Sequence, residues 1–363
     1  MEATLENTRK YLSESATAGA TSAGNVATLN RVILPVIRRV MPTVIANELV
    51  GVQPMTGPVG QIHTLRVRYS DTAGTGASGA VAGEEALSPF KIAEAYSGNA
   101  TSAKADATAA LEGAAGNRLS IQILKQTVEA KTRKLSARWT FEAAQDAQSQ
   151  HGIDVEAEIM AALAQEITAE IDQEVLASLN TLAGTGTDTF DQAAVSGTAT
   201  FVGDEHAALA VLVNRAANRI AQRTRRGAGN WAVVSPAILT VLQSATTSAF
   251  ARTTEGTFEA PTNTKMVGTL NNAMKIYVNT YAADDDVLVG YKGTSESDAA
   301  AFYCPYIPLM SSGVVLDPST FEPTVSFMTR YGYVELSNTA SSLGNAADYL
   351  EKVEVTANNL SFS

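Results

Sequence analysis

The chain has 363 residues, of which 45% are hydrophobic and 17% charged, and its formal net charge is −11. This composition excludes a disordered chain, and the negative charge argues against a nucleic-acid-binding protein. No apolar run reaches the roughly 18 residues that a membrane-spanning helix needs. The single cysteine, Cys304, excludes internal disulfides and cysteine-based zinc sites. We therefore expect a globular, non-membrane protein that is long enough for two or three lobes.

The charges are segregated along the chain. Between Arg138 and Arg215 there is no lysine or arginine, while the same stretch carries thirteen aspartates and glutamates, so the remainder of the chain has a net charge of +2. This pattern is typical of a solvated face. It also fits a surface that repels an anion or meets a basic partner, and both interpretations stay open.

The first part of the chain indicates little regular structure. Residues 1 to about 30 are polar, rich in Ser, Thr, Ala and Gly, and without periodicity, which favours an extended arm or a mobile tail. Prolines then break residues 29–62 into short turns. From His63 to Tyr69 apolar residues alternate with polar ones, which predicts a strand with Arg66 and Arg68 on one face.

A long excursion follows this strand. Of the 49 residues from Ser70 to Arg118, 31 are Ala, Gly, Ser or Thr, and we expect such a stretch to build no core of its own. Strand alternation resumes over residues 119–123 and becomes regular over residues 135–141. The pattern predicts one β-excursion that leaves near residue 62 and returns near residue 135. A loop this long with so little core makes sense if it lies on a neighbouring subunit.

The clearest element is a helix over residues 154–182. Asp154 is its expected N-cap and Gly184 follows its end as a stop signal. The apolar residues recur at every fourth position: Val155, Ile159, Leu163, Ile167, Ile171, Val175 and Leu179. Because four residues overshoot a helical turn by about 40°, this stripe winds around the helix and its two ends need different partners. We interpret the helix as a spine that crosses the subunit, with an ordinary long core helix as the alternative.

The chain beyond residue 204 alternates helices and strands. A helix is predicted from Asp204 to Arg226, and the whole pattern favours an α/β lobe over residues 204 to about 315. Four apolar strands are predicted in this lobe, over residues 231–234, 274–278, 287–291 and 301–307. Residues 320–336 and 349–356 read as closing strands.

One motif matches a cofactor-binding pattern. GTGASG, from Gly74 to Gly79, has the glycine spacing of a dinucleotide-binding turn. That turn needs a buried strand before it and a helix after it. Here the preceding strand carries arginines and the following residues lack apolar periodicity. A nucleotide-dependent oxidoreductase therefore remains only a remote alternative, and we expect no cofactor.

No other pattern predicts catalysis or metal binding. The three histidines, His63, His151 and His206, lack metal-ligand spacing. Asp284 to Asp286 read as a charged turn, and Cys304 as a small buried hydrophobic residue. Carboxylate pairs on the long helix need an adjacent pocket to act as an acid and a base. We expect neither catalytic residues nor a metal site.

A group of arginines closes the second predicted helix. It comprises Arg215, Arg219, Arg223, Arg225 and Arg226. Cations are favoured near a helix C-terminus, but five arginines exceed that need. We expect an inter-subunit ion-pair surface here, with nucleic-acid binding as a weaker alternative.

Several stretches resemble the major capsid proteins of T4-like tailed phages, which have the HK97-type shell fold. They run in order along the chain: VIRRVMPTVIANELVGVQPMTGPVGQI (36–62), ALEGAAGN (110–117), KQTVEAKTRKLSARWTFEAAQDAQSQHGIDVEAE (125–158), NWAVVSP (230–236), VLVGYKG (287–293), FYCPYIPL (302–309) and TRYG (329–332). Few residues precede this block and the excursion is low in complexity, so the resemblance does not extend to a long propeptide or to a folded insertion.

The resemblance implies an α+β, HK97-like fold. Its parts are an N-terminal arm (1–60), an extended loop or E-loop (61–135), a peripheral domain with the spine helix (136–203), an axial domain (204–318) and the closing strands of the peripheral domain (319–363). The sequence Leu12-Ser13-Glu14 resembles the prohead protease site of this family, so Glu14 marks a candidate cleavage site.

The resemblance also implies a structural function without catalysis. Copies of the chain would form the hexamers and pentamers of an icosahedral head, assembled in the bacterial host cytoplasm around double-stranded DNA that is not bound sequence-specifically. Vertex, portal, scaffold and decoration proteins would be its other partners. A cellular, encapsulin-like nanocompartment shell of the same fold is the nearest alternative.

Overall fold

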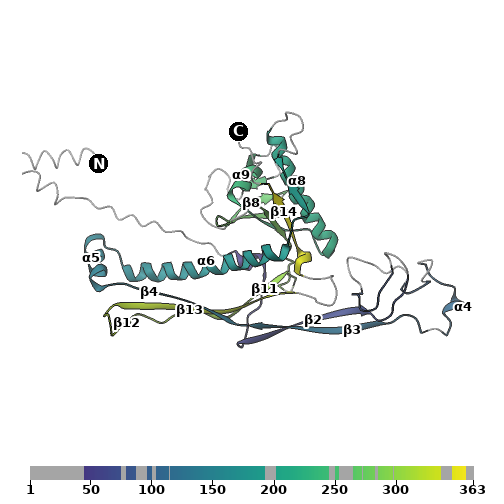
Figure 1. The fold of residues 1–363 in the computed structure, drawn as a ribbon, viewed down its shortest axis with the longest axis horizontal. Helices are drawn as coiled ribbons and strands as arrows, with labels where there is room; N and C mark the ends of the chain where they lie inside the picture. The colour runs from purple at the N-terminus through teal and green to yellow at the C-terminus, as the bar shows by residue number, and fades with distance from the viewer. Residues whose placement is uncertain are drawn as a thin grey trace, which may run out of the picture.

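The subunit is elongated and is built around one long helix (Figure 1). The structure is a computed structural model that describes residues 45–74, 79–86, 96–99, 104–113, 115–192, 202–244, 250–252, 265–271, 273–282, 285–296, 298–336 and 346–356. Three parts surround the helix: a sheet along its length, a lobe over one end and a two-stranded ribbon that projects beyond that end. Among these described residues, no helix is long and apolar enough to cross a membrane.

The long helix is α6, Val155–Ala183, which confirms the helix predicted over residues 154–182. The Asp154 side chain accepts hydrogen bonds from the backbone N–H groups of Glu156 and Ala157, and so satisfies two donors that the first turn leaves unpaired. At the other end Gly184 has a φ of 67°, a left-handed conformation that glycine adopts without steric cost. Local signals therefore set both ends of this helix.

The apolar stripe of α6 winds onto two different sets of partners. Leu163 and Ile167 are buried against Val325 and Phe327 of the sheet. Further along, Val175, Leu176 and Leu179 are buried in a second cluster with Ile45 and Leu49, next to and within the short helix α3, Ala46–Leu49. Val155, Ile159 and Ile171 are half-buried. The fourfold spacing thus produces the change of partner that it predicts.

A five-stranded sheet runs along α6 (Figure 1). Its central strand is β13, Pro323–Glu335, which pairs antiparallel with β4, Lys131–Arg138, and with β11, Ala301–Ser311. The strands β1, Gly51–Val52, and β12, Val315–Leu316, complete it. Strand β11 covers the strand predicted over residues 301–307, which we assigned to the α/β lobe. That assignment is wrong, because strand pairing places it in this sheet.

Helix α5, Phe141–His151, lies between β4 and α6, where strand alternation predicts that the strand continues through Phe141. The strand ends at Arg138 instead. The Thr140 side chain accepts a hydrogen bond from the N–H of Ala143, so a capping residue starts a helix at this point. The alternation of apolar and polar residues alone therefore overestimates the length of this strand.

A seven-stranded sheet forms the core of the lobe. Its order is β5 (Asp188–Phe190), β14 (Leu350–Val355), β10 (Val287–Gly290), β6 (Trp231–Val234), β9 (Met274–Val278), β8 (Lys265–Leu270) and β7 (Phe250–Arg252). Helices α8 (Val202–Thr224) and α9 (Pro236–Ser244) contribute to its buried cluster, and a 3₁₀-helix, η2 (Ala346–Tyr349), precedes β14.

The lobe is therefore assembled from more of the chain than the sequence predicts. Strand β5 lies between the two predicted helices, where no strand is predicted, and β14 covers residues expected to close the other domain. Both join the lobe sheet, where β14 pairs with β10 and β5. The expected boundaries at residues 203 and 318 do not match the way the sheets divide the chain.

The ribbon consists of β2, Val59–Tyr69, and β3, Leu119–Glu129. The two strands pair in continuous antiparallel register from Val59 opposite Glu129 to Tyr69 opposite Leu119. The return strand of the excursion is thus β3. The residues near 135, which we expected to complete it, lie in β4 of the five-stranded sheet.

A small core holds the outer end of the ribbon, against the expectation that this stretch has none. The rings of Tyr69 and Tyr96 lie 4.4 Å apart at their centroids. They are buried with Ala73, Ala80 and Ala86. The Tyr96 hydroxyl donates a hydrogen bond to the backbone carbonyl of Arg118. The short helix α4, Thr108–Leu111, lies further along this segment.

Candidate assembly surfaces

One face of the ribbon is apolar and open to solvent. Alternate residues of paired strands share a face, so Leu65 lies opposite Ile123 and Val67 opposite Ile121. The side chains of Leu65 and Ile121 are 64% and 69% exposed, and Ile123 is similarly exposed. A contiguous exposed apolar face of this kind marks a contact surface. The other face carries Arg66, whose guanidinium lies 2.8 Å from Glu85.

A second exposed apolar group lies at the end of the five-stranded sheet that is distant from the lobe. We call it the distal patch, and it comprises Met310, Val314, Val315, Leu316 and Phe321. Phe321 is 70% exposed and has a φ of 58°, a conformation that few residues other than glycine adopt. Its ring packs 5.6 Å from that of Phe141, at the start of α5. The turn therefore holds a large aromatic side chain in solvent.

The arginine group is used largely within the subunit. Arg219 lies 2.9 Å from Asp188 of β5 and 3.5 Å from Glu351 of β14. Arg223 lies 2.6 Å from Glu351, and Arg215 lies 3.5 Å from Asp188. These contacts fasten α8 to the edge of the lobe sheet. These three arginines therefore pair with carboxylates of their own chain, and an inter-subunit role for them stays a prediction.

The last two arginines of the group lie beyond the end of α8. Arg226 lies 2.7 Å from Asp298, again within the chain. Arg225 is exposed, with a φ of 47°. A contact between Arg225 and another subunit stays a prediction.

The acidic stretch includes carboxylates that pair with an arginine of the same chain and others that are exposed on the helices. Arg133 of β4 donates hydrogen bonds to Glu170, at 2.6 Å, and to Glu174, and so ties the sheet to α6. Burial raises the pKa of Glu174, but hydrogen bonds from Arg133 and Tyr331 outweigh it and hold that pKa below its usual value. No local sequence pattern signals this contact between β4 and α6, because it joins residues far apart in the chain.

The exposed acidic groups are left on the surface of α5 and α6. Glu142, Glu156 and Glu166 are exposed there. Part of the segregated charge therefore stays solvated on α5 and α6, and part is paired with an arginine of the same chain.

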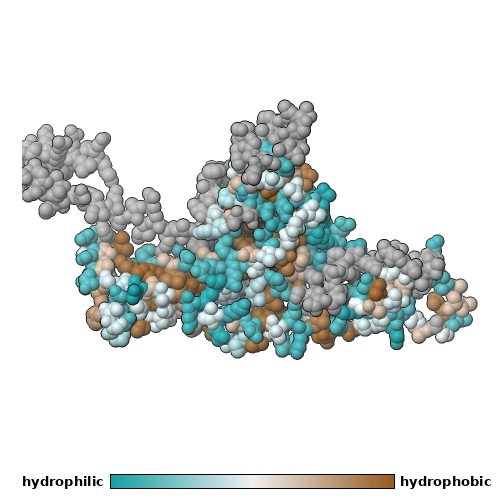
Figure 2. Space-filling model, in the orientation of Figure 1, coloured by the Kyte–Doolittle hydropathy of each residue, from teal (hydrophilic) through white to brown (hydrophobic). Residues whose placement is uncertain are grey.

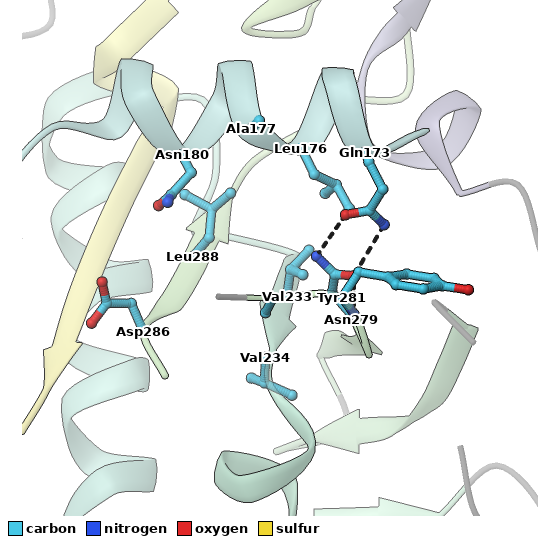
Figure 3. A pocket seen from close by; sticks show the side chains of 11 residues that line it. Gln173, Leu176, Ala177, Asn180, Val233, Val234, Asn279, Tyr281, Asp286 and Leu288 are labelled. Carbon is cyan, nitrogen blue, oxygen red and sulfur yellow. Dashed lines mark hydrogen bonds between the residues drawn. The ribbon is translucent and has the colours of Figure 1, made fainter. Parts of the chain in front are cut away.

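A cavity of about 230 Å³ lies between α6 and the lobe (Figure 3). Gln173 and Asn279 exchange hydrogen bonds of 3.1 and 3.3 Å across it. The Asp286 carboxylate lies 2.6 Å from the Lys352 ammonium and accepts a hydrogen bond from the N–H of Val355. The cavity lining holds amides and one carboxylate that is paired with a lysine. It offers no acid and base pair of the kind that the long helix would need for catalysis.

The other chemical motifs have structural surroundings. The Asp285 carboxylate accepts a hydrogen bond from the Ser235 hydroxyl at 2.7 Å. Asp284, residues 75–78 of the GTGASG motif and Glu14 lie outside the described residues. Cys304 is buried, as the sequence predicts. Within the described ranges, no group of three or more His, Cys, Asp or Glu residues is arranged to hold a metal ion.

Comparison with known proteins decides between the interpretations. Residues 26–356 match the family described as Major capsid protein Gp23. The chain belongs to this family. The major capsid protein of Enterobacteria phage T4 is 30% identical over 91% of this chain and 80% of its own length. That of Vibrio phage KVP40 is 29% identical over 90% of this chain and 80% of its own length.

Solved phage structures have the same fold as this chain. A structure of Mycobacterium phage Adephagia superposes with a TM-score of 0.56 at 11% identity, covering 93% of this chain and 98% of that chain. The capsid of Cyanophage P-SCSP1u gives a TM-score of 0.53 at 12% identity, covering 93% of this chain and 99% of that chain. The fold is the α+β, HK97-type capsid fold.

Membership in this family establishes the general function of the protein. The protein is a structural major capsid protein of tailed phages, a homo-oligomeric component of the virion shell, and not an enzyme. The encapsulin-like shell and the nucleotide-dependent oxidoreductase are not favoured by these matches.

Proposed function

We propose that this major capsid protein forms the hexamers and pentamers of an icosahedral head that encloses double-stranded DNA. The observation that carries the proposal is the exposed apolar face of the β2–β3 ribbon, which projects beyond the subunit's own core (Figure 1). Covering a surface of this kind with another surface removes apolar area from water, which is favourable. A neighbouring copy supplies that cover in a closed shell.

The three parts of the subunit take three roles in this proposal. The ribbon is the E-loop that lies on the next subunit. The five-stranded sheet with α6 is the peripheral domain, and the seven-stranded lobe is the axial domain at the capsomer centre. Most of the N-terminal arm expected over residues 1–60 lies outside the described residues. The distal patch supports this arrangement, because it gives the peripheral domain an apolar contact surface at the end opposite the lobe.

The exposed carboxylates of α5 and α6 suit an inner wall. Packaged DNA must slide along the wall, and like charges prevent it from adhering. We therefore place the α6 face toward the DNA, which is enclosed without sequence-specific contacts.

Vertex, portal, scaffold and decoration proteins complete the head in this proposal. Assembly takes place in the bacterial host cytoplasm. Glu14 is the candidate site of proteolytic processing.

Charging the apolar face of the ribbon tests the proposal. The double substitution Ile121→Glu and Ile123→Glu places carboxylates on this face, whereas Gln122→Glu changes the opposite face of the same strand. We expect the double variant to fold but to form no shells, and Gln122→Glu to form them normally. The readouts are circular dichroism, sedimentation and electron microscopy. Normal shells from the double variant would refute the role of the ribbon.

A further inference from the structure

A small pocket lies between α6 and β11, and its volume is about 190 Å³. Its apolar wall consists of Ile167 and Ile171 from the helix and Pro305, Ile307 and Leu309 from the strand. Figure 2 shows hydrophobic residues gathered along the part of α6 that lies away from the lobe. Leu309 is exposed, whereas Ile171 and Ile307 are half-buried, so the apolar wall reaches solvent.

One group that lines the pocket is both charged and buried. It is Asp172 of α6, which is only 3% exposed. Its two carboxylate oxygens accept one hydrogen bond each from backbone N–H groups, that of Ile45 at 3.1 Å and that of Ala46 at 3.3 Å. Because each oxygen of an ionised carboxylate has two acceptor positions, each keeps one for a further donor.

The charge of Asp172 is not compensated by a cation within the described part of the chain. No lysine, arginine or histidine there forms an ion pair with it. Burial raises the pKa of Asp172 to about 6, and the two backbone hydrogen bonds offset this only in part. Burial also raises the pKa of Tyr303, another lining residue, and the charge of Asp172 raises it further. A cation beside this carboxylate would therefore be attracted strongly.

The lining restricts the kind of cation that fits. Calcium takes about six to eight oxygen ligands, whereas Asp172 is the single carboxylate among the described lining residues. The pocket is also smaller than the roughly 300–1,000 Å³ of sites for drug-sized ligands, so a nucleotide is too large for it. The isoleucines of the wall favour an alkyl chain, because the contact removes apolar surface from water. An ammonium group on a short alkyl chain satisfies both the charge and the wall.

We propose that this pocket binds a small alkylammonium ion, with its ammonium group at Asp172 and its alkyl chain against Ile167, Ile171 and Ile307. The ammonium group donates hydrogen bonds to the acceptor positions that the backbone N–H groups leave on the carboxylate. The aromatic ring of Tyr303 adds a second attractive surface for the cation. All of these residues belong to one subunit, so the site does not depend on how subunits are arranged in a shell.

NMR of the isoleucine methyl groups in the unassembled subunit tests the site near pH 7.5, where Asp172 and the ammonium group are both ionised. The probe is n-butylammonium chloride. For comparison, n-butanol has the chain without the charge, and ammonium chloride has the charge without the chain. We expect saturable shifts at Ile167, Ile171 and Ile307, and none at Ile276 in the core of the lobe. Butylammonium should bind at least tenfold more tightly than either comparison compound. Equal affinities for the three compounds, or no saturable shift, would overturn the proposal.

Two substitutions separate ligand binding from folding. Asp172→Asn keeps the size of the side chain but removes its charge, and should weaken butylammonium binding at least tenfold. Thr168→Leu leaves the carboxylate in place and fills part of the pocket, so it should weaken binding as well. Thr181→Leu is the matched control. Thr168 and Thr181 each donate a 2.8 Å hydrogen bond to the carbonyl four residues earlier on α6, but Thr181 is exposed and lies outside the pocket. Parent-like affinity in either of the first two variants would overturn the proposal.

The alkylammonium group of a lysine side chain from a neighbouring copy has the same chemistry as a free amine. Equilibrium dialysis of assembled shells against radiolabelled n-butylammonium distinguishes the two sources. We expect the shells to bind the probe as the unassembled subunit does. Binding that is present in the subunit and lost in the shells would show that a neighbour covers the site, and would overturn its assignment to a free amine.

Discussion

The contact between Arg219 and two buried carboxylates makes a sharp prediction about the lobe. Arg219 lies between Asp188 of β5 and Glu351 of β14, at 2.9 and 3.5 Å. Glu351 is 4% exposed. Arg219→Leu keeps a hydrophobic stem of similar length but removes the guanidinium. Among the described residues, Arg215 and Arg223 then remain as the cationic partners of the two carboxylates.

The expected loss follows from the geometry. Removing one partner of a buried ion pair typically costs 3–5 kcal/mol, because it leaves a buried charge uncompensated. Arg223 still lies 2.6 Å from Glu351, and Arg215 still reaches Asp188. We therefore expect the lower end of that range, about 3 kcal/mol of unfolding free energy. Replacing Arg219 and Arg223 together by glutamate would gather four carboxylates, so that variant should lose the lobe itself rather than only its assembly.

Urea denaturation of the unassembled subunit, followed by tryptophan fluorescence, measures this effect. Arg225→Leu is the control, because Arg225 is exposed, and its unfolding free energy should change by less than about 0.5 kcal/mol. Asp188→Asn completes a double-mutant cycle with Arg219→Leu, and the coupling should be about 1–3 kcal/mol. A loss below about 1 kcal/mol for Arg219→Leu, or a coupling near zero, would refute the role of this contact in holding α8 to the sheet.

Two further substitutions test α6. Ile167→Glu buries an unpaired carboxylate between α6 and Val325, which costs several kcal/mol. We therefore expect no soluble particles on sedimentation. A particle yield equal to the parent's would show that the apolar stripe is not buried there. Burial raises the pKa of Asp172 to about 6, above its ordinary value of 3.8. The folded chain therefore binds this proton more tightly than the unfolded chain does. The stabilisation from this proton is lost as the pH rises from 4 to 7. Asp172→Asn should remove this pH-dependent part of the unfolding free energy, up to roughly 3 kcal/mol, as measured by urea titration at pH 4 and pH 7. Identical pH profiles for the two proteins would contradict this prediction.

Elements with local signals were predictable from the sequence. The ends of α6 follow from Asp154 and Gly184, and its change of partner follows from the fourfold spacing of the stripe. Strands 231–234 and 274–278 were predicted with the bounds that the structure has. These predictions succeed because capping, turn and periodicity signals act within a few residues.

Sheet membership and ion pairs depend on contacts that no local pattern encodes. β11 joins β13 rather than the lobe, and β14 joins the lobe, through pairing between distant segments. Arg219 meets Asp188, 31 residues away, and Glu351, 132 residues away. A helical arginine row looks the same in a sequence whether its partners lie in its own chain or in another. The small core at the outer end of the ribbon was not predicted, because it consists mainly of alanines together with Tyr96. The composition of this segment indicates low complexity.

The central claim is that copies of this chain close into a shell through the apolar ribbon. Cryo-electron microscopy of the purified protein across a concentration series tests it most directly. We expect closed particles built of sixfold and fivefold capsomers, with density for the β2–β3 ribbon lying across the neighbouring subunit. Monomers at every concentration, or shells in which the ribbon contacts only its own subunit, would contradict it.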